Sequence, residues 1–176
     1  VRSLKVTSLS RARGIRFPLG KLLADQIESA RSLDQRMKQR VVGQDWAIDR
    51  IADAMRAAHL AQTRDLDIRA VFVEAVLNCT PWLMWDVKTG APTPGADTLE
   101  VQETLESAFR TIPGAMDHPG LLHLHVHLME MSSTPEAALL TGDRLRELTP
   151  DMGHLVHMPT HIDIQCGHYR DTIHWN

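Results

Sequence analysis

Apolar residues recur at three- and four-residue steps through most of this chain, which is the pattern of amphipathic α-helices. The clearest periods run through residues 20–40, 45–62, 66–78 and 98–112. No segment alternates with the two-residue period of a half-buried strand. We therefore predict an all-α fold.

Proline and glycine separate the predicted helices. Residues 89–97 (TGAPTPGAD) hold two prolines and two glycines and are predicted to form a loop. Pro119 and Pro135 stand at first-turn positions, where a missing N–H costs nothing, so we expect helices at 118–131 and 134–148. Gly167 ends a helix predicted at 153–166, before a last one that begins at 169. Short helices with tight breaks favour antiparallel helix pairs.

The histidines gather in the last third of the chain, where nine of ten lie between His118 and His174. His123 and His127 are four residues apart, and a second pair, His157 and His161, follows 34 residues later at both positions. Four-residue spacing places two side chains on one face of a helix, and 34 residues is the period of a stacked helix-turn-helix repeat. Two adjacent helices are therefore expected to point a histidine pair toward the same place.

This arrangement predicts a transition-metal site. Glu130 follows His127 by three residues and lies on the same predicted helical face. The expected ligands are His123, His127, Glu130, His157 and His161, with His154 and His118 as further candidates. Two histidines with a carboxylate suit iron or hydrolytic zinc, and four histidines suit copper or zinc, so zinc, iron and copper all remain open. An open coordination position would activate water or dioxygen, but no catalytic residue is assigned.

Two other interpretations of the histidine cluster remain open. The side chains would form a hydrogen-bonded polar core without metal, or they would line a groove for a peptide or small molecule. His125 is expected to be structural or exposed, and His168 and His174 are expected to be surface or packing residues. Trp82 and Trp85 are expected to pack at a helix end, with the lining of a ligand pocket as the alternative.

Several motifs together carry a family resemblance. They are His118-Pro119-Gly120, the His123, His127 and Glu130 set, and the segment 153–161 (GHLVHMPTH), with Asn78, Pro81, Trp82 and Trp85 upstream. On these motifs, residues 46–176 resemble a little-characterised group of tetratricopeptide-repeat (TPR) proteins. The resemblance implies a TPR-like α-solenoid over residues 21–176, with an incomplete last repeat. It implies no agreed activity, so a non-catalytic scaffold for a peptide or protein partner is the alternative function. The open face of an incomplete repeat would also favour self-association.

Composition narrows the partners and the compartment. A net charge of −3 argues against nucleic acid, and the longest apolar stretches are interrupted before 18 residues, so no membrane-spanning helix is expected. Two cysteines fit a reducing compartment, which favours the cytoplasm. Residues 1–20 are basic, contain serine and lack acids, so we predict a poorly ordered N-terminal segment, with an organelle transit peptide as the alternative. Because the chain begins with Val and its last predicted helix is incomplete, we expect a fragment or a processed form.

Overall fold

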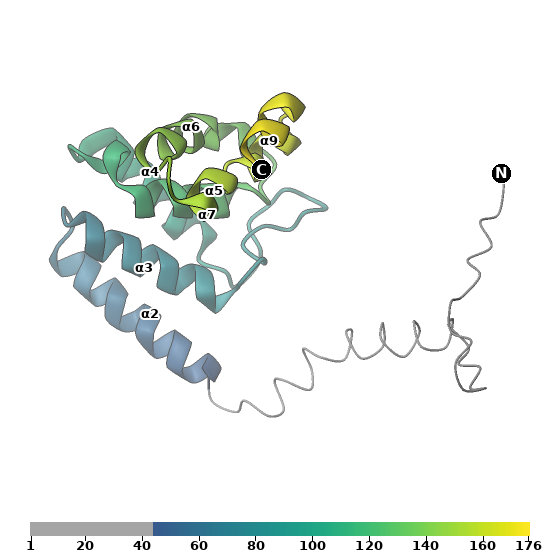
Figure 1. The fold of residues 1–176 in the computed structure, drawn as a ribbon. Coiled ribbons are helices and arrows are strands. Elements are labelled where there is room, and N and C mark those ends of the chain that lie inside the picture. Colours follow the sequence, from purple (N-terminus) through teal and green to yellow (C-terminus); the bar gives the residue numbers. More distant parts are fainter. Residues whose placement is uncertain (1–43) are drawn as a thin grey trace, which may run out of the picture. The chain divides into compact units, whose positions relative to one another are not determined.

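The computed structural model describes residues 44–176, and the regular structure of this part is helical (Figure 1). Its only β-type pairing is an isolated bridge between Trp85 and Pro92. The all-α prediction is confirmed for these residues, whereas the predictions for residues 1–20 and for a helix at 20–40 lie outside them. None of the described helices is long and apolar enough to cross a membrane. The elements are α2 (Gln44–Ala61), α3 (Leu66–Cys79), α4 (Thr98–Thr111), η1 (Ala115–Asp117), α5 (Pro119–Met129), η2 (Pro135–Ala138), α6 (Leu139–Leu148), α7 (Gly153–His157), α8 (Thr160–Gln165) and α9 (Tyr169–Trp175).

Helices α2 and α3 form a hairpin and pack along each other (Figure 1). Asp65 begins α3 because its side chain accepts a hydrogen bond from the backbone N–H of Ile68 at 3.0 Å, which satisfies one of the free N–H groups of the first turn. Phe72, Val73 and Val76 of α3 are buried in the core. Helix α3 also contacts α4 and α5 and so joins the hairpin to the rest of the described chain.

Helix α5 lies at the centre and contacts α3, α4, α6 and α8. Its side chains are buried nearly all round, which fits a helix surrounded by other helices. The buried residues are Leu121, Leu122, Leu124, His125, Val126, Leu128 and Met129. His123 and His127 are the half-buried exceptions within the last two turns. The four-residue spacing therefore marks the one face of α5 that its neighbours leave partly open.

The prediction of a single helix at 153–166 is wrong, because two short helices, α7 and α8, occupy this region. Pro159 separates them. It has no N–H with which to continue the hydrogen-bond ladder of α7, so the ladder stops there. The N–H of His161 instead donates to the carbonyl of Met158, three residues back, at 3.1 Å. His157 and His161 consequently stand on different helices.

The α7–α8 segment is held to α6 by a buried ion pair and by the close approach of Pro159 to Gly142. The guanidinium of Arg146 donates to the carboxylate of Asp163, and both side chains are almost fully buried. Gly142 of α6 faces Pro159, and a Cβ at Gly142 would lie 2.9 Å from the Cβ of Pro159. These contacts fix where the α7–α8 segment sits against the core.

Candidate metal centre

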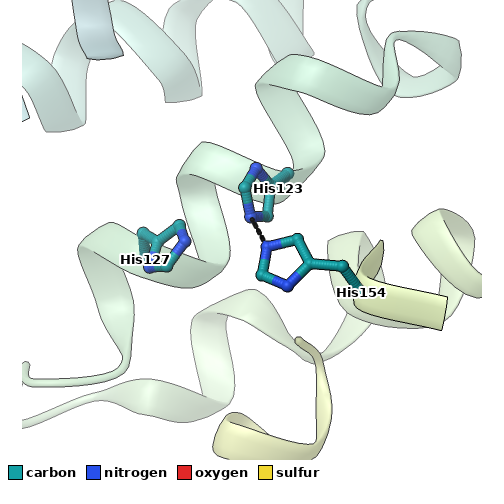
Figure 2. A group of neighbouring side chains, drawn as sticks. All are labelled: His123, His127 and His154. Atoms are coloured by element: carbon teal, nitrogen blue, oxygen red, sulfur yellow. Dashed lines mark hydrogen bonds between the residues drawn. The ribbon is translucent and has the colours of Figure 1, made fainter. Parts of the chain in front are cut away.

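Three histidines from two helices converge on one point (Figure 2). His123 and His127 project from the partly open face of α5, and the exposed His154 reaches them from α7. One ring nitrogen from each residue can be chosen so that all three atoms lie within 4.8 Å of one another. We call these residues the three-histidine cluster.

Two of the three ring nitrogens in the cluster are spaced like ligands on one metal ion. The Nε2 atoms of His154 and His123 are 3.2 Å apart. Two imidazole nitrogens bound to a tetrahedral zinc ion at its usual bond length lie about 3.4 Å apart. The ring centres of His123 and His127 are 4.6 Å apart, so the third ring stands within reach of the same point.

Burial keeps His123 in the form that binds metal. It lowers the pKa of His123 to about 4, and the neighbouring His127 and His154 add to the shift because a further positive charge would be repelled there. A neutral imidazole has a free lone pair for a metal ion, whereas an imidazolium has none. His123 is therefore available as a ligand at neutral pH.

Glu130 lies outside the three-histidine cluster but orients His127, which belongs to it. Its carboxylate is buried, with Oε1 3.2 Å from Nδ1 of His127 and Oε2 2.5 Å from Nδ1 of His161. Burial alone would raise the pKa of Glu130, but the hydrogen bonds from His127 and His161 outweigh it and lower the pKa. An ionised carboxylate can only accept hydrogen bonds, so both Nδ1 atoms donate. In the neutral form of each ring, Nε2 is then the nitrogen that carries the lone pair.

His157 and His161 form a second pair beside the cluster. Their Nε2 atoms are 3.2 Å apart, and their rings are nearly perpendicular. Glu130 links this pair to the cluster because it contacts both His161 and His127. The structure thus brings all five expected ligands into one neighbourhood, and a single ion bound by all five stays a prediction.

The remaining histidines have other roles. His118 caps α5, since its Nδ1 accepts from the N–H of Leu121 at 3.2 Å and its Nε2 lies 3.0 Å from a carboxylate oxygen of Asp67. His125 is buried, with Nδ1 2.8 Å from the hydroxyl of Thr141, and burial lowers its pKa to about 4. His168 and His174 are exposed, as expected.

A cavity of about 200 Å³ opens beside the cluster, and His123 and His127 form part of its wall. Trp85 packs as expected: it is buried, and its indole N–H donates to the carbonyl of Leu128 at 2.7 Å. Trp82 does not, because it is 61% exposed, lines this cavity and meets His127 edge-on with ring centres 6.0 Å apart. The sequence carried no spacing signal for this role, since Trp82 follows the end of α3, more than forty residues before His127.

Comparison with known proteins yields no relative: no family model, no curated protein and no solved structure matches the chain. The geometry of the site is therefore the basis for a proposed function.

Proposed function

We propose that this protein binds one transition-metal ion through His123, His127 and His154. The observation that carries the proposal is the convergence of three imidazoles, two of them with Nε2 atoms 3.2 Å apart, on a partly open face of the central helix. Glu130 supports it, because metal-bound histidines usually donate their other ring N–H to a carboxylate. In this arrangement Nδ1 of His127 donates to Glu130, which turns Nε2 of the same ring toward the ion.

The donor set favours zinc over iron. Three neutral imidazoles with an open fourth position form a common catalytic zinc site, whereas non-haem iron usually takes two histidines and a directly bound carboxylate. The carboxylate of Glu130 is engaged by two imidazole N–H groups and is therefore better placed as an outer partner. A zinc ion held in this way lowers the pKa of a bound water, so the activity we propose is hydrolytic. Copper is the alternative ion.

Elemental analysis of the full chain tests the proposal. After loading with zinc and removal of excess metal, we expect one zinc per chain, and loss of most of it in His123→Ala and His154→Ala. The matched control is His168→Ala, which removes an exposed histidine and should retain full stoichiometry. Less than a tenth of a metal per chain in the wild type, after zinc and after copper, would refute the metal site. Full stoichiometry in His123→Ala would refute the ligand assignment.

We further propose that residues 46–176 are TPR-like. Support comes from the paired helices α2 with α3 and α5 with α6, which pack against each other. The division of the second histidine segment into α7 and α8 is a departure from a uniform repeat.

The alternative function, a scaffold for a protein partner, is favoured by one surface feature. Tyr169 and Ile173 of α9 are four residues apart and highly exposed, with Ile173 at 81%. Such a pair is suited to contact with another chain, including a second copy. Sedimentation at rising protein concentration tests self-association, which Ile173→Asp should abolish. A scaffold role would leave association unchanged when metal is chelated.

A further inference from the structure

The cavity beside the three-histidine cluster is lined mainly by apolar side chains and has two carboxylates in its wall. Its apolar wall comes from α3, the loop after it, and α5. The apolar lining residues are Leu77, Pro81, Trp82, Met84, Trp85, Leu124, Leu128 and Met131. The polar residues that complete it are Glu74, Asn78, His123, His127 and Glu130. Lysine and arginine do not occur in this lining.

The charged groups in the cavity wall favour neutral ligands over anionic ones. Glu74 and Glu130 both carry carboxylates, and no lysine or arginine lines the cavity to offset them. Glu130 is the deeper of the two, because it is buried whereas Glu74 is exposed. A molecule that carried its own carboxylate or phosphate would be repelled, whereas a neutral molecule would not.

The size and shape of the walls favour a single ring. A cavity of about 150 Å³ lined by apolar side chains accommodates benzene, and this one has about 200 Å³. Two tryptophans and two methionines contribute to it, and both side-chain types make favourable contacts with aromatic rings. The loop that carries the tryptophans is anchored by Trp85 on the Leu128 carbonyl and by Thr98, whose hydroxyl donates to the Met84 carbonyl at 2.5 Å.

We infer that this cavity binds a small neutral one-ring molecule with one oxygen donor, of the chemical class of phenols, and presents that oxygen to the metal centre. His123 and His127 belong both to the cluster and to the cavity wall. A donor atom on the ring would therefore reach an ion at the cluster from the cavity side. The second half of this inference rests on the proposed metal site, whereas the binding of the ring does not.

Phenol is the probe, and its affinity for the full chain is measured by ligand-observed NMR with and without zinc. In metal-free protein we expect phenol to bind at least tenfold more tightly than benzoate, which has the same ring and a negative charge. Zinc loading should tighten phenol binding by threefold or more. Equal binding of phenol and benzoate to the metal-free chain, or no binding of phenol, would overturn the inference.

Two variants test whether phenol binds in this cavity. Leu77→Trp fills it and should weaken phenol binding tenfold, while Val71→Trp, on an exposed position of the same helix outside the cavity, should not. Trp82→Gly removes a wall and should weaken phenol binding several-fold. It should also fold normally, because Trp82 has a φ of 62°, which glycine adopts without strain. Unchanged phenol affinity in Trp82→Gly would overturn the assignment of the cavity.

The two proposals fail separately. Phenol binding to metal-free protein without any bound zinc after loading would retain the cavity and refute the metal centre. Zinc bound at one per chain without phenol binding would retain the metal centre and refute the cavity.

Discussion

At the scale of single residues, Glu130 determines which nitrogen each neighbouring imidazole offers. It directly follows α5 as the C-cap, and its backbone N–H donates to the carbonyl of Val126 at 2.9 Å. Its two carboxylate oxygens accept from Nδ1 of His127 and of His161, and its backbone carbonyl accepts from the Gln165 side chain. One buried side chain therefore orients two histidines that come from different helices.

Replacing Glu130 with glutamine should weaken zinc binding about 10–100-fold, the usual effect of losing an outer partner of a metal-bound histidine. Glutamine has nearly the same shape but only one acceptor oxygen, and its NH₂ would face an imidazole N–H. Competition with a chromophoric chelator measures the affinity. Glu136→Gln, at an exposed position, is the matched control. If Glu130→Gln bound zinc as tightly as the wild type, the orienting role would be excluded.

His59 makes the stability of the α2–α3 hairpin depend on pH. Its ring stacks on Phe72 with centres 5.1 Å apart, and its buried Nδ1 has no hydrogen-bond partner among the described residues. Burial lowers the pKa of His59, and the nearby Arg69 adds to the shift. Below its ordinary pKa of about 6.5 the unfolded chain binds a proton that the folded chain resists. This contribution to stability is complete above that pH and is lost as the pH falls below it.

We therefore expect His59→Phe to reduce the loss of stability on acidification. Phenylalanine keeps the stacking on Phe72 and has no proton to bind. Urea unfolding at pH 7.5 and pH 5.5 measures the difference, and the variant should lose less free energy of unfolding between the two than the wild type. His168→Phe, at an exposed position, is the control. An identical loss in His59→Phe and the wild type would contradict the argument.

At the scale of elements, the packing of α6 against the α7–α8 segment positions His154. Gly142 permits this packing because an added Cβ would meet Pro159 at 2.9 Å. Such a contact is closer than side chains normally tolerate, so the segment would have to move. His154 lies five residues before Pro159, on the same segment.

Gly142→Ala should therefore destabilise the fold by about 1–3 kcal/mol, as overpacking of a core usually does, and should also weaken zinc binding. Gly153→Ala is the control, because a Cβ there meets nothing within 4 Å although the residue lies on the same segment as His154. Thermal unfolding and chelator competition measure both quantities. Normal stability and normal zinc affinity in Gly142→Ala would show that the contact does not position the segment.

At the scale of the whole described unit, a bound metal ion would link α5 to α7, two helices that share no backbone hydrogen bonds. His123 and His154 are 31 residues apart along the chain and lie on α5 and α7. Binding to the folded chain alone stabilises it by an amount that grows with ligand concentration. Helix α7 is short and none of its residues is fully buried, so a bond from His154 to the ion would add to its attachment.

Free zinc at 100 times its dissociation constant should stabilise the chain by about 2.7 kcal/mol, which corresponds to a rise in Tm of about 5–10 °C. Differential scanning fluorimetry with added zinc, followed by EDTA, measures the rise and its reversal. The effect should be absent in His154→Ala. A zinc-dependent rise that persisted in that variant would place the ion elsewhere.

Much of the helical structure was predictable because it is encoded locally. The periods at 45–62, 66–78 and 98–112 agree with α2, α3 and α4 to within one or two residues. Pro119 and Gly167 mark helix ends through their own backbone chemistry, which needs no tertiary partner. The sequence also placed His123 and His127 on one face of one helix, since four-residue spacing suffices for that.

Only the tertiary structure decided which side chains meet. His154 reaches His123 because Pro159 and the packing on Gly142 set the position of α7. His157 and His161 are in contact although they stand on two different helices, so their four-residue spacing predicted their proximity but not the elements that carry them. The loop that brings Trp82 to His127 has no hydrophobic periodicity from which its position could be predicted.

By itself the sequence determined the helices and the histidine face of α5, because those depend on neighbours along the chain. The ligand set and the cavity depend on contacts between distant segments, which spacing along one chain does not encode.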